Sequence, residues 1–349
     1  TNIGFLMLLC AGITSLSIWV SFKYSHLINK LIKVKFIKVK FIKVIVTTLI
    51  QRSQSAGNFV TFYSFDESTS ETLRDKSAIK KISVHVPTHF KPINDIDFGH
   101  YLAGLIDGDG NFSKTPQLVV AFNEADASLA YYIKGRIGYG NVYKVKNKKA
   151  VNLVVSKQVG IKKVLDLING KIRSQNKLDQ IKINILLNNS HSYFKTFSHF
   201  NVNTDVNLNN YWLSGFSDAD ASFQIKLITR NKKTEVRLNF QIDQKKNDLL
   251  ILIKHFLGGN IGYRKSQETY YYGSTSFGSA KKVINYFDTF NLLSSKHVSY
   301  LKWRKAYILI QNKEHLTTSG LTKITKLKHT MNRNNSLLTK TDVINGSAG

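Results

Sequence analysis

Hydrophobic and polar side chains alternate along residues 222–242, and this alternation predicts a half-buried hairpin. The apolar positions of the two predicted strands are Phe223, Ile225, Leu227, Val236, Leu238, Phe240 and Ile242. The residues between them are polar or basic, and a polar turn over residues 229–233 joins the strands. A period of two is typical of an antiparallel sheet that packs one face on a core and leaves the other face open.

The segment before this hairpin has a helical pattern that occurs twice in the chain. Residues 101–110 read YLAGLIDGDG, and residues 211–220 read YWLSGFSDAD. Each stretch combines an aromatic residue, an apolar helical turn with small residues, and an Asp-x-Asp ending. The two final aspartates, Asp109 and Asp220, are 111 positions apart.

The similarity between the two halves continues beyond these motifs. The matching segments are Ile133-Lys134 with Ile253-Lys254, Gly140-Asn141 with Gly259-Asn260, and Lys162-Lys163-Val164 with Lys281-Lys282-Val283. Their spacing is 119 or 120, whereas the spacing at the aspartates is 111. Because the spacing then stays nearly constant, the pattern indicates a duplicated domain whose second copy has a longer first hairpin.

Each copy has the pattern helix, two strands, helix, two strands, helix. We therefore predict an α+β fold with two pseudo-symmetric αββαββα units and antiparallel sheets. The predicted segments are a hydrophobic and basic leader (1–94), the first unit (95–187), a linker (188–209), the second unit (210–331) and a tail (332–349).

The leader begins with an uncharged, mostly apolar run over residues 3–22, which is long enough to cross a bilayer. Lysines follow this run and form the positive flank of a membrane segment. We therefore expect the leader to associate with a membrane, and we interpret residues 1–94 as an exon-fused or processed extension.

The charge of the chain predicts a polyanionic partner. The 349 residues include 50 Lys and Arg against 22 Asp and Glu, which gives a formal net charge of +28. Such an excess repels itself in a compact fold, so nucleic acid or an anionic membrane surface is the expected partner. The single cysteine, Cys10, excludes an intramolecular disulfide and a cysteine-based zinc site.

Small residues form a stripe along each motif helix. Gly104 and Gly108 are four positions apart, as are Gly215 and Ala219, so each pair lies on one helical face. A glycine inside a helix costs about 1 kcal/mol relative to alanine, and close packing of two helix backbones offsets that cost. We expect the motif helices to pack on each other through this stripe. The other small residues assigned to it are Ala103 and Ser214.

Packing of this kind would bring Asp109 and Asp220 together where the helices end. Two carboxylates about 4 Å apart repel by about 4 kcal/mol at an effective dielectric constant of about 20. Both also lie at the negative ends of helix dipoles. Such a pair requires a proton, a lysine or a divalent metal. Oxygen ligands suit Mg²⁺, which accepts phosphate oxygens and activates water for phosphodiester hydrolysis.

The two motifs resemble those of a single-chain LAGLIDADG homing endonuclease of the intron-encoded, organellar type, and the similarity covers residues 95–331. In this family the motif helices form the central interface, and saddle-shaped sheets on either side lie along the DNA major groove. The resemblance implies that Asp109 and Asp220 bind the divalent metals, with help from the backbone carbonyls of Gly108 and Ala219.

The resemblance also implies basic and polar residues beside the metal site. Lys177 and Lys296 are 119 positions apart, and each precedes a predicted helix. They are similar to the basic residues that stabilise charge on the phosphate in this family. Gln244 is similar to the polar residue that orders water, and counting without gaps from Ile133 places Glu124 at the same point of the first unit.

The polar face of the predicted hairpin carries amide and cationic side chains that suit base edges and phosphates. The predicted DNA-binding residues are Gln224, Lys226, Arg230, Lys232, Lys233, Arg237, Asn239 and Gln241.

We therefore predict a site-specific, Mg²⁺-dependent endonuclease that cuts both strands of a long, nearly asymmetric double-stranded DNA target and promotes intron homing. A diverged duplication suits a monomer that recognises two unlike half-sites. The alternative is an RNA maturase that assists splicing of its host group I intron, because members of the family have either activity or both. The expected compartment is the mitochondrion, with the chloroplast as the alternative, because Lys- and Asn-rich usage suggests an A·T-rich genome.

Overall fold

The computed structural model describes residues 81–187, 200–231 and 233–333. The apolar run at residues 3–22 lies outside these ranges, as do Lys232 and parts of the predicted linker and tail. Within the ranges that are described, no helix is long and apolar enough to span a bilayer.

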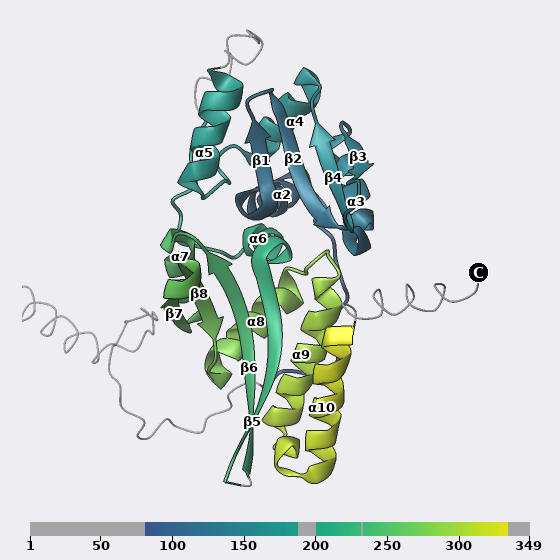
Figure 1. Cartoon of the computed structure of the whole chain (residues 1–349), viewed down its shortest axis with the longest axis vertical. Coiled ribbons are helices and arrows are strands. Elements are labelled where there is room, and N and C mark those ends of the chain that lie inside the picture. Colours follow the sequence, from purple (N-terminus) through teal and green to yellow (C-terminus); the bar gives the residue numbers. More distant parts are fainter. Residues whose placement is uncertain (1–80, 188–199, 232, 334–349) are drawn as a thin grey trace, which may run out of the picture. The chain divides into compact units, whose positions relative to one another are not determined.

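The first unit follows the predicted order of elements (Figure 1). Its elements are α2 (Asp95–Asp109), β1 (Gly110–Ser113), β2 (Gln117–Asn123), η1 (Glu124–Asp126), α3 (Ala127–Ile137), β3 (Asn141–Lys144), β4 (Ala150–Val155), α4 (Gln158–Ile168), α5 (Gln175–Ile181) and η2 (Lys182–Leu186). Helix α5, with its π-helical continuation η2, follows the predicted seven elements.

The second unit repeats this order and continues into one further helix. Its elements are α6 (Trp212–Asp220), β5 (Ala221–Arg230), β6 (Lys233–Gln244), α7 (Asp248–Leu257), β7 (Asn260–Arg264), η4 (Lys265–Gln267), β8 (Thr269–Ser274), α8 (Phe277–Thr289), α9 (Lys296–Gln311), η5 (Glu314–Leu316) and α10 (Thr318–Arg333). Helix α9 corresponds to α5, whereas α10 has no counterpart in the described part of the first unit.

The two sheets have the same topology. Their strand orders are β1-β2-β4-β3 and β5-β6-β8-β7, and every neighbouring pair is antiparallel. The predicted α+β fold with two equivalent units is therefore confirmed. Strands β5 and β6 have 10 and 12 residues, against 4 and 7 in β1 and β2, so the longer first hairpin of the second unit is confirmed too.

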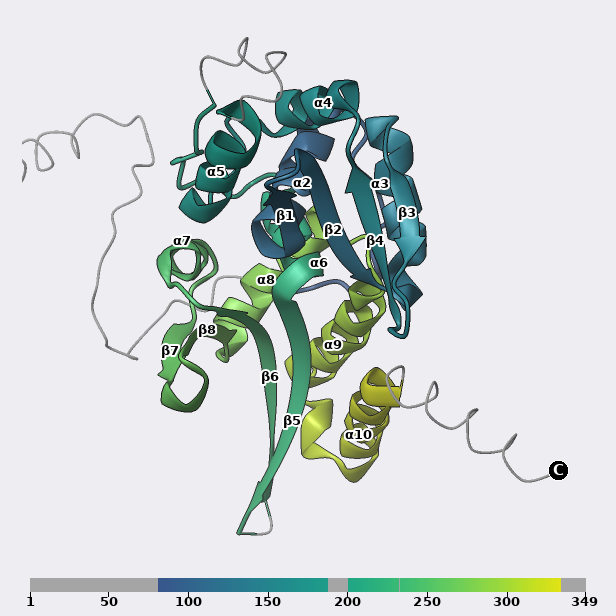
Figure 2. The same cartoon turned by 45° about the horizontal axis from the view of Figure 1, so that its top comes forward.

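The motif helices α2 and α6 pack against each other between the two sheets (Figures 1 and 2). A Cβ atom at Gly104 would lie 1.9 Å from the carbonyl oxygen of Trp212, and one at Gly215 would lie 2.0 Å from that of Tyr101. Only glycine permits backbones to approach this closely, so the predicted packing through the small-residue stripe is confirmed. Ser214 does not belong to this contact, because its hydroxyl donates to the carbonyl of Asn291 within the second unit at 2.6 Å.

Residues 82–94 run from the second unit to the first unit. The backbone N–H of Ile82 donates to Oε1 of Gln311 in α9 at 2.8 Å. Farther along, Arg136 in α3 donates to the carbonyl of Pro92 at 2.5 Å. This part of the predicted leader therefore packs against both units before the chain enters α2.

Candidate active site

Both motif helices end abruptly because the chain passes from the last helical residue directly into a strand. Helix α2 ends at Asp109 and helix α6 ends at Asp220, and the next residues, Gly110 and Ala221, are already extended. Gly110 and Ala221 are buried as the first residues of β1 and β5. The two aspartates are thereby held at the point where a helix axis meets a sheet.

The two carboxylates lie at the contact between the helices. A Cβ atom at Gly108 would lie 2.3 Å from the Cβ of Ala219 and 2.9 Å from Oδ2 of Asp220, so the Asp220 carboxylate reaches across to the first helix. Burial and the repulsion of Asp109 raise the pKa of Asp220 to about 6. Desolvation by the surrounding protein also raises the pKa of Asp109 above its usual value, although the residue is still exposed at the surface. The structure thus brings together the two predicted metal ligands.

Two lysines approach these carboxylates, one from each unit. Lys296 in the first turn of α9 donates to the carbonyl oxygen of Ala219 at 2.6 Å and to that of Ser217 at 3.2 Å. Lys177 in α5 donates to the carbonyl oxygen of Gly110. Burial lowers the pKa of both lysines, while Asp109 and Asp220 oppose that shift.

Gln244 at the end of β6 donates to Oδ2 of Asp220 at 2.6 Å. The prediction that Glu124 is its counterpart is wrong. In the two sheets, Gly110 pairs with Val120 and Ala221 pairs with Ile242, so the position two residues farther along is Phe122 in the first unit.

The neighbouring strand gives the same correspondence. Phe122 pairs with Val151 and Gln244 pairs with Tyr270, and Val151 and Tyr270 are separated by the repeat spacing of 119. Phe122 is buried in the core, whereas Glu124 lies beyond the strand in η1 and pairs with Lys144 at 2.7 Å. Counting without gaps failed because Ile133 lies 11 positions after Phe122, whereas Ile253 lies 9 positions after Gln244.

The first aspartate of each Asp-x-Asp ending has a structural role that the sequence reading missed. Asp107 accepts hydrogen bonds from the backbone N–H groups of Arg173 and Ser174, at 2.8 and 3.1 Å. Asp218 likewise accepts from the N–H groups of Leu293 and Ser294, at 2.7 and 3.3 Å. Each buried carboxylate therefore ties its motif helix to the loop that leads to the lysine of the same unit.

The same two carboxylates also join the units to each other. The indole Nε1 of Trp212 donates to Asp107 at 2.8 Å, and the hydroxyl of Tyr101 donates to Asp218 at 2.8 Å. Tyr101 and Trp212 are 111 positions apart, as are Asp107 and Asp218. This repeated spacing marks them as equivalent residues of the two units, but it does not by itself show that they pair across the helix contact.

Six of the predicted DNA-binding residues share one face of the β5–β6 hairpin: Gln224, Lys226, Arg230, Arg237, Asn239 and Gln241. Gln224 pairs with Asn239, and Lys226 pairs with Arg237, while the core residues alternate with them. The remaining predicted residues are Arg230 and Lys233, which pair at the hairpin end, Gln241, which pairs with Ser222, and Lys232, which lies outside the described residues. Asn239 and Gln241 are buried by their neighbours, since Asn239 donates to Gln241 at 3.1 Å and Gln241 donates to Asp243 at 2.9 Å.

The residues present fit a divalent metal ion. In the described part of the chain, no group of three or more His, Cys, Asp or Glu side chains could hold a metal. The site instead offers two carboxylates whose pKa values are raised even with Lys177 and Lys296 beside them. Oxygen-only donors that leave further positions for water and phosphate suit Mg²⁺ better than zinc.

Comparison with known proteins identifies the family. Residues 213–307 match the family described as LAGLIDADG endonuclease. The chain is 56% identical over 329 residues to an uncharacterized cox1 intron-2 37.2 kDa protein of Schizosaccharomyces pombe, and the match covers 93% of this chain and 97% of that protein. The chain therefore belongs to the LAGLIDADG endonuclease family.

A more distant relative is an intron-encoded endonuclease, and two solved structures share the fold. The intron-encoded DNA endonuclease aI3 of Saccharomyces cerevisiae is 27% identical, with 65% of this chain and 68% of that protein covered. The meganuclease I-SmaMI bound to uncleaveable DNA has a similar fold, with a TM-score of 0.54 and 22% identity over 66% of this chain and 97% of the other. The meganuclease I-CpaMI bound to uncleaved DNA has the same TM-score of 0.54 at 18% identity, over 67% of this chain and 99% of the other.

Proposed function

We propose that the chain is a site-specific endonuclease that hydrolyses a phosphodiester bond in each strand of double-stranded DNA, with Mg²⁺ as the metal, and so promotes intron homing. The observation that carries this proposal is the pair Asp109 and Asp220 at the contact between the motif helices, with Lys177 and Lys296 beside it. A purely structural helix contact would not need two carboxylates that repel each other and so help to raise the pKa of Asp220.

In this proposal Asp109 and Asp220 would hold the metal, and the carbonyls of Gly108 and Ala219 would be further oxygen donors, the second of them shared with the ammonium group of Lys296. At that position a bound Mg²⁺ ion would supply Lewis-acid chemistry, which lowers the pKa of a bound water and stabilises charge on the leaving oxygen. Lys177 and Lys296 stabilise negative charge on the phosphate. Both ammonium groups are close enough to Asp109 and Asp220 to interact with their charges, so they lie beside the position where the phosphate would bind. Gln244 orients a water molecule next to Asp220, since its amide already donates to that carboxylate.

The duplication supports a monomer that reads a long, nearly asymmetric target. The nuclease comprises residues 95–187 and 210–331, joined by residues 188–209, while residues 1–94 form the leader and residues 332–349 the tail. The similarity to a cox1 intron-2 protein and to intron-encoded endonucleases supports an origin in a mitochondrial intron and a mitochondrial location. The leader, with its apolar run, is proposed to contact a membrane.

Cleavage of a plasmid that carries the joined exon sequence tests this function. The purified chain should linearise the plasmid in Mg²⁺ and leave it intact in EDTA. A second plasmid in which the coding intron still interrupts the exons serves as the control and should stay uncut. If neither the joined-exon plasmid nor a randomised duplex library is cut in any divalent metal, the endonuclease proposal is wrong.

A maturase function is the second candidate. The chain is 28% identical over 57% of its length to the intron-encoded RNA maturase bI4 of Saccharomyces cerevisiae, although the match covers only 30% of that protein. A maturase would bind its host group I intron RNA and accelerate its splicing. Because RNA binding does not require the carboxylate pair, Asp109→Asn should abolish DNA cleavage and leave splicing intact if the chain has both activities.

A further inference from the structure

Two segments of the chain lead into the motif helices and occupy equivalent places in the repeat. The first strap, residues 82–94, leads into α2, and the second strap, residues 200–209, leads into α6. At the motif spacing of 111, Phe90 in the first strap corresponds to Asn201 in the second. The first strap belongs to the predicted leader, and the second belongs to the predicted linker.

The first strap contacts the loop that leads to the site lysine of the second unit. The ring Nε2 of His89 donates to the carbonyl oxygen of Leu292 at 2.8 Å, and the backbone N–H of Phe90 donates to Oδ1 of Asn291 at 2.7 Å. The ring of His89 also packs edge to face on that of His297, with 4.4 Å between the centroids. Because His297 directly follows the lysine in the sequence, the first strap touches the loop on both sides of that lysine.

The second strap contacts the corresponding loop of the first unit. The backbone N–H of Asn203 donates to the carbonyl oxygen of Ile172 at 2.7 Å. The N–H of Asn201 donates to Oδ1 of Asn169 at 3.2 Å, and the N–H of Gly170 donates to the carbonyl oxygen of Asn201 at 3.3 Å. Both straps therefore donate a backbone N–H from an equivalent position to an asparagine side chain near the loop of the opposite unit.

The loop carbonyls that the straps bind belong to equivalent peptide groups. In the first unit, the peptide group between Ile172 and Arg173 donates its N–H to Asp107 at 2.8 Å and accepts from the second strap. In the second unit, the peptide group between residues 292 and 293 donates its N–H to Asp218 at 2.7 Å and accepts from the first strap. A peptide group that is bonded on both sides has its orientation fixed. Each lysine loop is thus held between a motif aspartate and a strap.

Arginines of the first unit fasten both straps. Arg136 in α3 donates to the carbonyl oxygens of Pro92 and Asn94 in the first strap, at 2.5 and 3.1 Å. The guanidinium group of Arg173 donates to the carbonyl oxygen of Asn207 in the second strap at 3.0 Å. Each strap therefore connects the lysine loop of one unit to the motif helix of the other.

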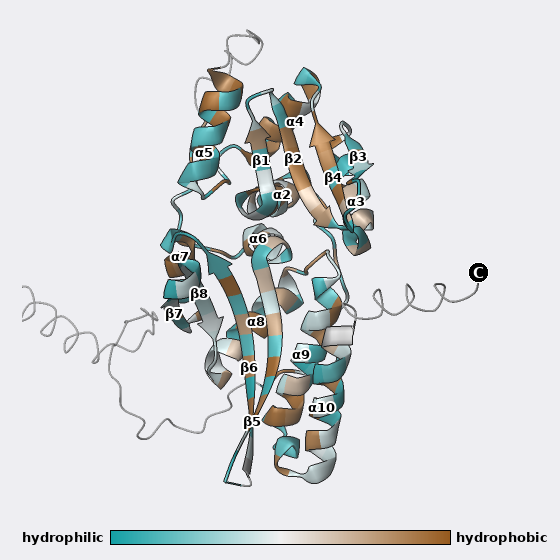
Figure 3. Cartoon of the chain, in the orientation of Figure 1, coloured by the Kyte–Doolittle hydropathy of each residue, from teal (hydrophilic) through white to brown (hydrophobic). Residues whose placement is uncertain are grey.

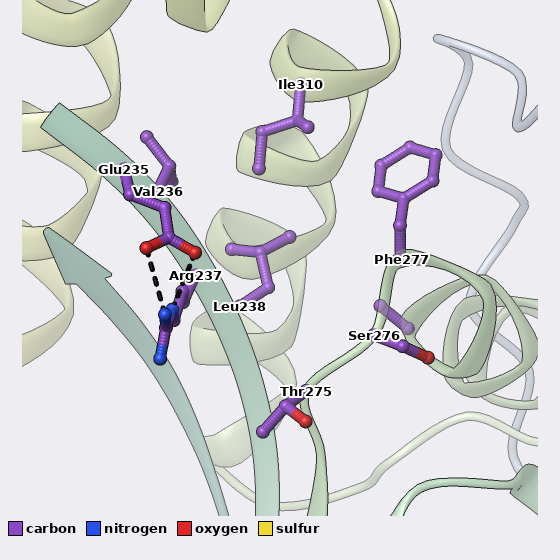
Figure 4. Close-up of a pocket in the computed structure, with 9 residues that line it drawn as sticks. Glu235, Val236, Arg237, Leu238, Thr275, Ser276, Phe277 and Ile310 are labelled. Atoms are coloured by element: carbon purple, nitrogen blue, oxygen red, sulfur yellow. Dashed lines mark hydrogen bonds and ion pairs between the residues drawn. The ribbon is translucent and has the colours of Figure 1, made fainter. Parts of the chain in front are cut away.

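Packing on the core fixes only one face of the helices that carry the lysines. Helices α5 and α9 have hydrophilic as well as hydrophobic bands (Figure 3). Near the end of α9, Ile310 lines a cavity of about 420 Å³ with Phe277 of α8 and Leu238 of β6, so contact with the sheet is incomplete there (Figure 4). The next residue, Gln311, instead exchanges two hydrogen bonds with the backbone of Ile82, at 2.8 and 3.0 Å. The first strap thus holds α9 near both of its ends.

We infer that the two straps are positioning elements for the reaction, each of which sets the loop of the opposite unit so that its lysine reaches the paired carboxylates. The first strap positions Lys296, and the second strap positions Lys177. Removal of the leader as far as residue 94 would therefore inactivate the nuclease. This inference rests on the proposed endonuclease function, in which both lysines stabilise charge on the phosphate.

Two equivalent proline substitutions in the full chain test the inference. Phe90→Pro and Asn201→Pro lie at exposed positions, and each removes the N–H that donates to a loop asparagine. Lysines are methylated with formaldehyde and a borane reductant in the absence of DNA and metal, and mass spectrometry gives the rate at each lysine. Phe90→Pro should label Lys296 about fivefold faster and leave Lys177 unchanged, since one lost hydrogen bond shifts a local equilibrium by about that factor. Asn201→Pro should do the reverse.

Cleavage and binding of the same variants separate positioning from a general loss of structure. Each proline variant should cut the target at least about tenfold more slowly, because a small displacement of a catalytic group has an effect of that size. DNA affinity in EDTA should stay within about twofold, since neither position is a predicted DNA-binding residue.

Substitutions of His89 test the first strap without proline, in case proline prevents folding. His89→Ala removes the ring donor, whereas His89→Gln supplies an amide N–H for the same carbonyl, so only the alanine variant should expose Lys296 and slow cleavage. The matched control is His85→Ala, an exposed histidine four positions earlier on the same strap. Its backbone carbonyl, and not its ring, accepts the hydrogen bond from Arg304. This control should label and cut like the unaltered chain.

The outcomes distinguish the inference from the proposed function. Equal labelling of the two lysines in every variant, or an unchanged cleavage rate in a variant whose lysine has become exposed, overturns the inference and leaves the endonuclease function standing. If the unaltered chain cuts no duplex but the labelling changes as expected, the straps position the lysines and only the proposed function fails.

Discussion

The amide of Gln244 donates a 2.6 Å hydrogen bond to the carboxylate of Asp220, and the equivalent position in the first unit holds Phe122. Asp109 consequently has no amide donor beside it at that point, and Phe122 packs in the core instead. The two motif helices end in the same Asp-x-Asp pattern, yet the polar surroundings of the two final carboxylates differ. The two halves of the site should therefore differ in chemistry.

The first prediction concerns the order in which the DNA strands are cut. Of the equivalent strand positions 122 and 244, only the second holds an amide that can orient water, so one strand should be cut faster and a nicked intermediate should accumulate. Gln244→Leu should slow the faster cut by about tenfold or more, in the range typical of a lost positioning group, and change the slower cut little. Strand-specific end labels measure both rates.

DNA affinity in EDTA provides the control for this variant. The affinity should stay within about twofold of that of the unaltered chain, because Gln244 lies at the carboxylates and is not one of the predicted DNA-binding residues. Equal cleavage rates for the two strands, before and after the substitution, would show that the asymmetry at positions 122 and 244 has no catalytic consequence.

The second prediction concerns the metal carboxylates. Asp109→Asn and Asp220→Asn should each bind target DNA normally and lose cleavage by about a thousandfold or more, because each removes a charge that holds the metal. Gel shifts in EDTA measure binding, and plasmid linearisation measures cleavage. The control is Asp248→Asn, an exposed aspartate in the first turn of α7, which should cut normally. Normal double-strand cleavage by either active-site variant would contradict the metal assignment.

The third prediction concerns pH. The pKa of Asp220 is about 6 in the metal-free protein, above its ordinary value of 3.8, so the folded state holds its proton up to about pH 6. This group therefore contributes stability that decreases as pH rises from about 4 to 6. Metal binding needs the charged carboxylate, so affinity for Mg²⁺ should fall as pH falls through about 6.

Melting temperatures with and without Mg²⁺ between pH 5 and pH 8 check this linkage. The increase caused by Mg²⁺ should be largest above about pH 7 and disappear below about pH 6. Asp220→Asn should remove the increase at every pH. An equal increase at pH 5 and pH 8 would mean that the ion binds elsewhere.

The fourth prediction concerns the helix contact. Gly104→Ala would place a Cβ atom 1.9 Å from the carbonyl oxygen of Trp212, so the helices must separate. We expect the free energy of unfolding to decrease by about 3 kcal/mol or more, as for a severely overpacked core. Gly135→Ala is the control, because no atom lies within 4 Å of a Cβ at that exposed position of α3. It should stabilise the protein by up to about 1 kcal/mol. Denaturant unfolding measures both, and a similar change in the two variants would contradict the packing argument.

The sequence by itself determined the duplication, the order of helices and strands, and the longer hairpin of the second unit. These features depend on local periodicity and on constant spacing, which a chain displays before it folds. It also determined which helix face packs, because Gly104 and Gly215 are useful only where two backbones meet. The pairing of Asp109 with Asp220 followed from the same contact.

The tertiary structure alone decided which partners the remaining polar residues have. Asp107 and Asp218 accept from Trp212 and Tyr101 of the opposite unit, and no local pattern records a contact between segments more than a hundred positions apart. Phe122 occupies the position equivalent to Gln244 because of how β2 and β6 pair with their neighbouring strands. Hydrogen-bond ladders between distant strands set that register, so counting along the chain could not find it.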